Sequence, residues 1–376
     1  MSQVIDASIL THFASLEDPR DMRGKEHLLL DMITIALCAV MSGAEGWEDM
    51  AEYGRAKQDW LSTFLSLPNG IPCADTFRRV FARLDPEQMQ RCFVSWVNAI
   101  RELLGAEVVG IDGKTLRHSD DKGCGKAAIH MVSAWASANR LVLGQCKVDD
   151  KSNEITAIPA LLMSVLEITG CIVTIDAMGC QRDIASAILA RGADYVLALK
   201  GNQGSLFEDV QWLFQQAQAS EFEGVAHSFA QSIDIGHGRI ETRRCWTLSD
   251  LGYLTQAPRW AGLQTIVMVQ SERRYQGQTT TENRFFISSL PSQAALVMNA
   301  VRTHWSIENS LHWVLDVSFH EDASRIRRDF APQNMALLRH LALNLLSQDS
   351  SSKRGIAARR KRAAWDHTYP IKLLTQ

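Results

Sequence analysis

The chain has 376 residues, of which 46% are hydrophobic and 22% are charged, and its formal net charge is −3. These values are typical of globular proteins, and the length predicts two or more domains. The longest apolar stretch, from Leu28 to Met41, contains Asp31 and is too short to span a bilayer. With no recognisable signal peptide and no Cys-x-x-Cys pair, the sequence favours a reduced, cytoplasmic protein over a membrane protein, a zinc ribbon or a disulfide scaffold.

Residues 1–104 predict an all-helical amino-terminal domain. Apolar periodicity and turn residues indicate helices over 31–41, 47–64, about 75–84 and 87–104. The third of these carries Arg78, Arg79 and Arg83 close to one face. A short basic helix between two turns is compatible with a helix-turn-helix contact on DNA, although an ordinary solvated helix face is the alternative.

From residue 107 the pattern changes to strands that alternate with helices. We expect strands over 107–112, 129–137, 141–148, 171–176 and 194–199, and helices over 158–168, 182–191 and 205–217. The resulting order, β-β-β-α-β-α-β-α, predicts a mixed sheet covered by helices.

The remaining third predicts more strands and then helices again. Strands are expected over 242–248, 265–270 and 282–289, and helices over 292–302, from about 304–306 onward, and over 333–346. Residues 351–376 are basic and polar, which predicts a loosely ordered tail. Residues 301–376 hold 12 Lys and Arg against 7 Asp and Glu, a net +5 that suggests contact with a polyanion or, alternatively, a solvated tail.

Three acids, Asp112, Asp176 and Glu308, each close a short apolar run. An acid at the end of a buried strand projects at the carboxyl edge of the sheet, where open α/β sheets bind ligands. Acids gathered there repel one another and need a cation between them. Oxygen ligands of this kind favour Mg²⁺ or Mn²⁺, so the sequence predicts a metal site.

Each acid also has a simpler explanation. Asp112 precedes a glycine, and Asp-Gly is a common hairpin turn. Asp176 is placed to cap the following helix, and Glu308 is placed in a first helical turn, where the helix dipole favours acids.

Two alternatives involve the segment around Glu308. His304, Glu308 and His312 share one helical face, which is a possible transition-metal site. Asp316 lies two turns beyond Glu308 on the same face and is the main alternative as third acid.

Several longer strings resemble those of bacterial insertion-sequence transposases of the DDE type, and most closely the H-repeat-associated group. The strings that carry the resemblance are Ile111-Asp112-Gly113-Lys114, Ile175-Asp176-Ala177, Ala198-Leu199-Lys200-Gly201-Asn202-Gln203 and His304-Trp305-Ser306-Ile307-Glu308-Asn309-Ser310-Leu311-His312-Trp313. The resemblance covers essentially the whole chain. It implies a ribonuclease-H-like catalytic domain over 105–348, a β-rich insertion at about 222–291 and a basic tail over 349–376.

The resemblance also implies the chemistry. Asp112, Asp176 and Glu308 become the catalytic acids and the ligands of Mg²⁺ or Mn²⁺, which would serve cleavage of double-stranded DNA at element ends and transfer to target DNA. A homodimer that brings two ends together is implied as well. Two alternatives are a catalytically silent DNA-binding protein and a nuclease without strand transfer.

The family's Tyr, Arg and Lys positions around the glutamate are not fully matched here, since Trp305 and Leu315 occupy two of them. Phosphate contacts are therefore expected from other cations. The candidates are Lys114, Lys200, Arg302, Arg325, Arg327 and Arg328, together with Arg78 and Arg79 of the amino-terminal helix.

Overall fold

Nine strands form one continuous sheet in the computed structural model, which describes residues 9–21, 25–101, 107–121, 123, 125–148, 153–164, 166–236 and 238–375. Within these ranges the strand order is β3-β2-β1-β4-β5-β9-β8-β7-β6. The strands are β1 Val108–Thr115, β2 His130–Ala136, β3 Leu141–Lys147, β4 Ile172–Ile175, β5 Asp194–Leu199, β6 His227–Gly236, β7 Arg239–Leu248, β8 Thr265–Tyr275 and β9 Gln278–Ser288.

The first half of the sheet has the expected mixed character. β1 pairs antiparallel with β2 and parallel with β4, which is in turn parallel to β5. Helices α7 (Glu154–Ser164), α8 (Arg182–Ala190) and α9 (Ser205–Ala219) separate the strands in the predicted order. Every residue of β4 is buried, as expected for a parallel strand covered on both faces.

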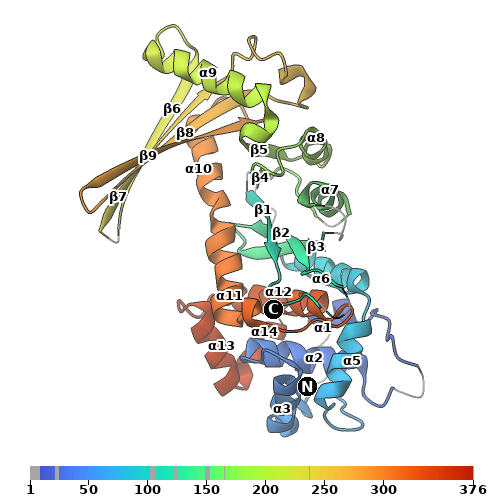
Figure 1. The fold of residues 1–376 in the computed structure, drawn as a ribbon. Helices are drawn as coiled ribbons and strands as arrows, with labels where there is room; N and C mark the ends of the chain where they lie inside the picture. Colours follow the sequence, from blue (N-terminus) through green and yellow to red (C-terminus); the bar gives the residue numbers. More distant parts are fainter. Residues whose placement is uncertain are drawn as a thin grey trace.

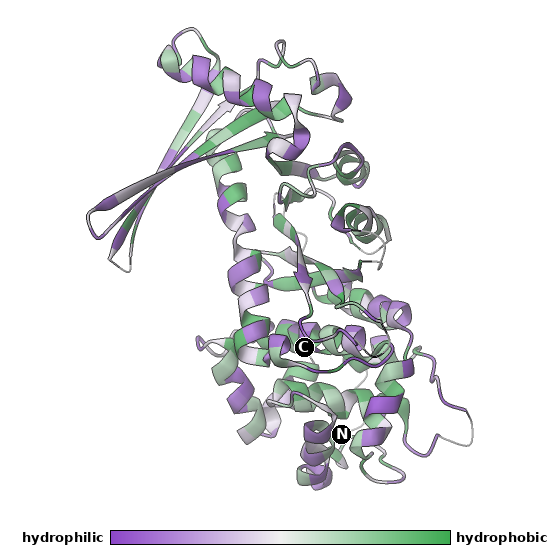
Figure 2. Ribbon diagram, viewed as in Figure 1, coloured by the Kyte–Doolittle hydropathy of each residue, from purple (hydrophilic) through white to green (hydrophobic). Residues whose placement is uncertain are grey.

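The second half differs from the prediction. β9 pairs antiparallel with β5, so the predicted β-rich segment continues the main sheet as a four-stranded ribbon (Figure 1). Its edge strand, β6, was not predicted as a separate strand. No residue of β6 is buried, and its large apolar residues, Phe229, Ile233 and Ile235, occupy exposed positions, so its sequence does not show the pattern of a half-buried strand. Figure 2 shows that the outer end of the ribbon is mostly hydrophilic, with Ile235 and Ile240 as apolar exceptions, and the buried residues of β9 lie at the end that pairs with β5.

One long helical run covers a face of the sheet, and α7 and α8 lie on the other face (Figure 1). The run begins with α10 (Ala294–His304), whose Val297 and Val301 pack on Val108, Ile172 and Val196 of three adjacent strands. It continues through the π-helical segment η5 (Glu308–His312) into α11 (Trp313–Phe319). The position of α10 relative to β1 is therefore fixed by a shared apolar core.

The helical part of the molecule combines both ends of the chain (Figure 1). Helix α12 (Ala331–Gln348) packs against α2, α5, α6 and β3. The amino-terminal helices are α1 Ile9–Phe13, α2 Leu29–Met41, α3 Trp47–Ala56, α4 Gln58–Leu61, α5 Ala74–Arg83 and α6 Pro86–Ile100. The single helix predicted over 47–64 is wrong, because Lys57 has non-helical backbone angles that separate α3 from α4. The predicted end of the last helix, at 102–104, lies outside the described residues.

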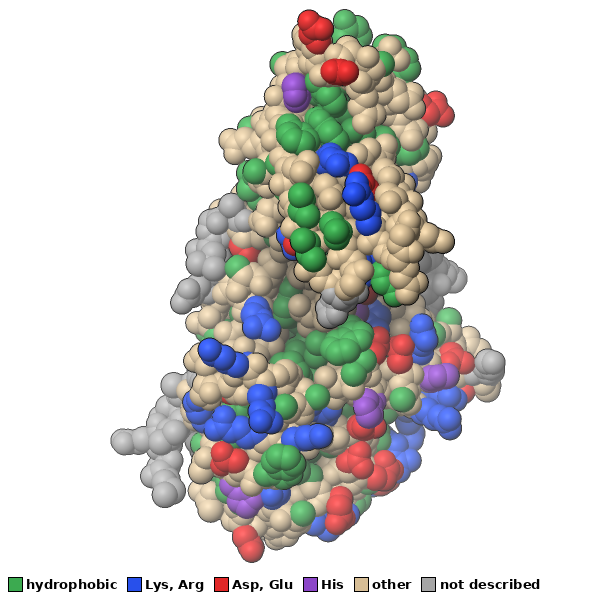
Figure 3. Space-filling view, turned by 90° about the vertical axis from the view of Figure 1, so that its left-hand side faces the viewer, with side chains coloured by type: hydrophobic (Ala, Val, Ile, Leu, Met, Phe, Trp, Pro, Cys, Tyr) green, Lys and Arg blue, Asp and Glu red, His purple; other side chains and the backbone are tan. Residues whose placement is uncertain are grey.

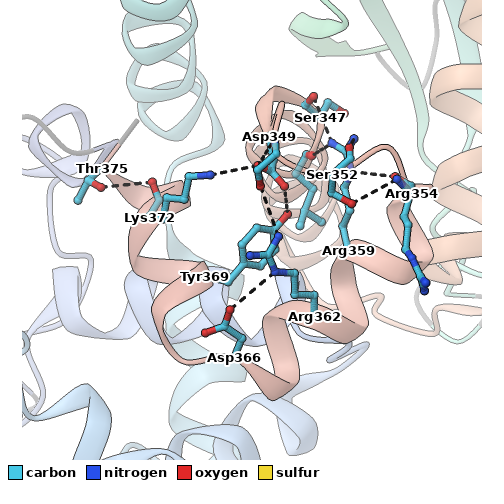
Figure 4. A network of polar contacts seen from close by, with 12 residues as sticks. Ser347, Asp349, Ser352, Arg354, Arg359, Arg362, Asp366, Tyr369, Lys372 and Thr375 are labelled. Carbon is cyan, nitrogen blue, oxygen red and sulfur yellow. Dashed lines mark hydrogen bonds and ion pairs between the residues drawn. The ribbon is translucent and has the colours of Figure 1, made fainter.

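The prediction of a loosely ordered tail is also wrong. Residues 356–374 form α13 (Ile356–Trp365) and α14 (Thr368–Leu374), which pack with α12. The Tyr369 hydroxyl donates to buried Asp349 at 2.7 Å, and the Lys372 ammonium donates to the same carboxylate at 3.3 Å (Figure 4). Arg360 is buried and donates to the carbonyl of Val40 on α2, at 2.8 Å from Nη2. Part of the basic charge at this end therefore holds the fold together.

No helix in the described part of the chain has the length and apolarity needed to cross a membrane.

Candidate active site

Asp112 lies inside β1, which extends to Thr115 and therefore runs further than predicted. The hairpin-turn explanation is wrong, because Asp112 and Gly113 pair in register with Ser133 and Val132 of β2. A side chain at position 113 would collide with Glu154 and His130, whose carboxylate and ring lie 2.6 Å apart. Position 113 thus requires a glycine because the side chains of Glu154 and His130 pack directly over it.

Asp176 follows β4 directly and lies beside Asp112. Ile111 of β1 is in register with Ile175 of β4, and the two strands are parallel. The next residue of each strand is an aspartate, so both acids occur at the same level of the sheet. Asp176 accepts the Met178 amide at 3.0 Å, whereas the following helix begins only at Arg182. The helix-cap explanation for Asp176 is therefore wrong.

Glu308 lies on the helical run that packs against the sheet, close to β1. It begins the π-helical segment η5, and π-helical turns are rare and often occur at functional sites. The helical run passes directly over β1: a Cβ at Gly110 would lie 3.5 Å from the Cβ of buried Ile307. This close approach brings the residue after Ile307 to the level of Asp112.

His312 completes the group around Asp112. Its Nδ1 lies 3.5 Å from Oδ2 of Asp112 and 3.6 Å from Oε2 of Glu308. Ligand atoms of these three residues all lie within 4.8 Å of one another. His304, the other histidine of the predicted helical face, instead places its Nδ1 3.0 Å from the hydroxyl of Thr174. The alternative metal site of His304, Glu308 and His312 is therefore wrong, because only Glu308 and His312 lie with Asp112.

The electrostatics of the group fit a bound cation. Burial raises the pKa of Asp112 to about 7, and three neighbouring carboxylates add to the shift. They belong to Glu308, Glu154 and Asp176. Burial lowers the pKa of His312, against the opposing effect of Glu308. A divalent cation between these groups would offset both the burial and the repulsion that make ionisation of Asp112 unfavourable.

Asp316 contacts Lys114 and not the group around Asp112. Its carboxylate accepts a hydrogen bond from the Lys114 ammonium, which also donates to Glu321 at 2.8 Å. Glu321 is buried and lies 3.6 Å from Arg339. The geometry thus brings Glu308 to Asp112, and it places Lys114 in an internal ion-pair network. A lysine held in this way offers little charge to an external phosphate.

A groove of about 360 Å³ contains all three predicted acids. Lys200, Arg284 and Trp305 also line it, and the Arg284 guanidinium stacks 4.8 Å from the centre of the Trp305 ring. Arg302 is not among the lining residues and forms an ion pair with Asp234 of β6 at 2.9 Å. Sequence reasoning did not single out Arg284, because its place beside the acids depends on β9 joining β5.

A second hollow of about 550 Å³ gathers cations from both ends of the chain. It is lined by Arg78 and by three arginines that precede α12, with Glu45 and Glu48 opposite; the three are Arg325, Arg327 and Arg328. Arg79 is not among the lining residues, and Asp75 pairs with both Arg79, at 2.8 Å, and Arg78, at 2.9 Å. On the face seen in Figure 3, Lys and Arg side chains gather in the lower half, which the terminal helices form.

Comparison with known proteins gives the same family over both parts of the chain. The family described as "Transposase DDE domain" matches residues 104–345, and the domain described as associated with it matches residues 10–97. The chain is 40% identical to "Putative transposase YncI" of Escherichia coli O157:H7, an alignment that covers 96% of this chain and 93% of that protein.

Two further relatives bear on activity. "H repeat-associated putative transposase YhhI" of Escherichia coli strain K12 is 38% identical, with 97% of each chain covered. "Inactive transposase YbfQ" of the same strain is 37% identical over 75 residues, which is 20% of this chain and 89% of that protein. Since the match extends over most of the sequence, this chain belongs to the DDE transposase family.

Proposed function

We propose that this protein is a DNA transposase that cleaves DNA at the ends of an insertion-sequence-like element and joins the freed 3′ ends to target DNA. The observation that carries the proposal is the meeting of Asp112, Asp176 and Glu308 in one groove. They come from β1, from the end of β4 and from η5, and up to 196 positions separate them in sequence. Such convergence is unexpected for acids that serve only local turns and caps.

The sheet topology supports a ribonuclease-H-like core for this chemistry. In the order β3-β2-β1-β4-β5, β2 alone runs in the opposite direction to the other four strands. The carboxyl ends of β1 and β4 therefore lie side by side. The ribbon β6–β9 follows β5 and precedes α10, and it adds Arg284 to the groove. We propose that it is an elaboration of the core that contacts the substrate.

The acids of the groove suit divalent cations. Asp112, Asp176 and Glu308 line the same groove, so these three carboxylates would together hold the divalent cations. A pair of divalent cations held by carboxylates stabilises the attacking and leaving oxygens of an in-line phosphoryl displacement. The three side chains would hold the cations in position and would receive no bond from the DNA themselves.

The basic residues supply the contacts with DNA. Lys200 lies beside the acids, where it can hold a phosphate that flanks the scissile bond. Arg284 lines the same groove, and it would have to exchange its ion pair with Glu282, at 2.9 Å, for a phosphate. Arg78, Arg325, Arg327 and Arg328 line the second hollow, which we assign to a more distant stretch of duplex. We further propose that two copies of the chain act together, one on each element end.

The test is a cleavage and joining assay on a plasmid that carries the DNA flanking this gene. Wild-type protein with Mg²⁺ or Mn²⁺ should produce 3′-hydroxyl ends at fixed positions and covalent joints to target DNA. Asp112→Asn should retain DNA binding but lose both products. Cleavage without joints would favour a nuclease, and binding without cleavage would favour a silent derivative. Full activity of Asp112→Asn would contradict the assignment of the site.

A further inference from the structure

The two ring nitrogens of His312 lie in different surroundings. The side chain is 8% exposed, and its Nδ1 points between the carboxylates of Asp112 and Glu308. Its Nε2 points into the protein, where no described residue offers it a hydrogen bond. A buried ring nitrogen without a partner is unfavourable, so this histidine needs an explanation beyond packing.

The distances on the Nδ1 side match those between ligands of one ion. Donors that surround a small divalent ion in octahedral geometry lie about 3 Å from one another, since each is about 2.1 Å from the ion. Nδ1 lies 3.5 Å and 3.6 Å from its two carboxylate neighbours, so a slight inward movement brings all three donors to one ion. Both distances are too long for a hydrogen bond from a ring nitrogen to oxygen.

The Nε2 side suggests how the ring is oriented. His312, Gln145 and His340 line a small cavity of about 10 Å³. Oε1 of Gln145 and Nδ1 of His340 are buried and without partners among the described residues. This volume is close to that of one water molecule, which would bridge the three atoms. An acceptor on that side keeps the proton on Nε2 and leaves the lone pair of Nδ1 directed at the carboxylates.

We propose that Nδ1 of His312 is a ligand of the divalent cation shared by Asp112 and Glu308. This inference rests on the proposed function, and it changes the expected chemistry of the site. A nitrogen donor disfavours Mg²⁺, which prefers oxygen ligands, relative to Mn²⁺ and later transition metals. The site therefore selects Mn²⁺ over Mg²⁺ more strongly than three carboxylates alone would.

The test uses Mn²⁺ bound to the full-length protein and pulsed electron paramagnetic resonance. A coordinated imidazole gives the bound Mn²⁺ a ¹⁴N hyperfine coupling, and protein labelled with ¹⁵N-histidine should replace it with a ¹⁵N coupling. His312→Gln should abolish the coupling and weaken Mn²⁺ binding at least about tenfold, with a smaller effect on Mg²⁺. His304→Gln is the matched control, because it removes a histidine of the same helical face whose Nδ1 faces Thr174.

The outcomes separate this inference from the proposed function. A nitrogen coupling that survives in His304→Gln and disappears in His312→Gln supports both. Mn²⁺ that binds wild-type protein, depends on Asp112 and shows no histidine coupling overturns the ligand assignment alone. Mn²⁺ binding that is unchanged in Asp112→Asn, or that is absent from wild type, overturns the ligand assignment and the metal site together. The ¹⁵N-histidine measurement on wild type decides the question even if His312→Gln does not fold.

Discussion

Lys114 donates a hydrogen bond to Glu321 at 2.8 Å, and this contact ties the strand that carries Asp112 to the segment after the helix that carries Glu308. The Glu321 side chain is 2% exposed and also lies 3.6 Å from Arg339. The Lys114–Glu321–Arg339 group thus connects β1, η6 (Glu321–Ala323) and α12 near the proposed metal site.

We expect Lys114→Met to destabilise the protein by about 3 kcal/mol, because it leaves a buried carboxylate with one cation fewer. Lys361→Met, on the exposed side of α13, should change stability by less than about 0.5 kcal/mol. Urea unfolding measures both values. Glu321→Gln should destabilise the Lys114→Met protein less than it destabilises wild type, because in that background only Arg339 loses its partner. Strictly additive effects in this double-mutant cycle would show that the two side chains are not coupled.

The third acid can be identified by comparing two substitutions. Glu308→Gln should slow DNA cleavage about 100- to 1000-fold, because a cation ligand is worth several kcal/mol in the transition state. Asp316→Asn should retain most of the rate, since Asp316 faces Lys114. Single-turnover cleavage at saturating Mn²⁺ measures both. The opposite ranking would transfer the third position to Asp316.

The basic hollow predicts a salt-dependent contribution to DNA binding. Replacing Arg325 and Arg328 with Gln should reduce the slope of log affinity against log salt by about 0.9 for each phosphate that the protein no longer neutralises. Arg91→Gln, at an exposed position of α6, is the control and should leave the slope unchanged. Fluorescence anisotropy over a range of NaCl concentrations gives the slopes. Equal slopes for all three proteins would remove the hollow from the DNA interface.

Asp112 predicts an unusual pH dependence of stability in metal-free protein. Its pKa is raised from 3.8 to about 7 by burial and by nearby carboxylates, so the folded protein keeps a proton that the unfolded chain loses above about pH 4. The stabilisation is present below pH 4 and is lost as the pH rises through 7, by at most about 1.4 kcal/mol per pH unit. The Asp112→Asn protein has no ionisable group at this position, so its stability should not fall for this reason.

Urea unfolding in EDTA at pH 5 and pH 7 measures the difference. The free energy of unfolding of wild type should fall relative to that of Asp112→Asn between the two pH values. Parallel behaviour of the two proteins would mean that Asp112 is already ionised at pH 5.

Local sequence patterns were sufficient for the first half of the sheet and for the pairing of two acids. β4 is a run of apolar residues followed by Asp176, and two such runs in parallel necessarily place their acids side by side. Helical spacing marked His312 as a candidate ligand together with Glu308. The π-helical segment η5 and the placing of His312, without His304, beside Asp112 were not predictable in the same way. They depend on how closely the helical run approaches Gly110 of β1, a distance that helical periodicity does not contain.

Charged residues were the hardest to assign from sequence. Lys114 follows an Ile-Asp-Gly string and was expected to contact phosphate, but its partners Asp316 and Glu321 are 202 and 207 residues away. Arg360 belongs to a basic run that predicted a solvated tail, yet it is buried against α2. Sequence shows the charge of such residues, whereas their role depends on partners that only the tertiary fold brings near.

The proposed metal site can be tested most directly by anomalous diffraction from crystals of the protein grown with Mn²⁺. We predict a Mn²⁺ peak about 2–2.4 Å from carboxylate oxygens of Asp112 and Glu308, at the end of the groove that Asp176 also lines. A Mn²⁺ peak beside Asp316, or no peak within reach of Asp112, would contradict the assignment.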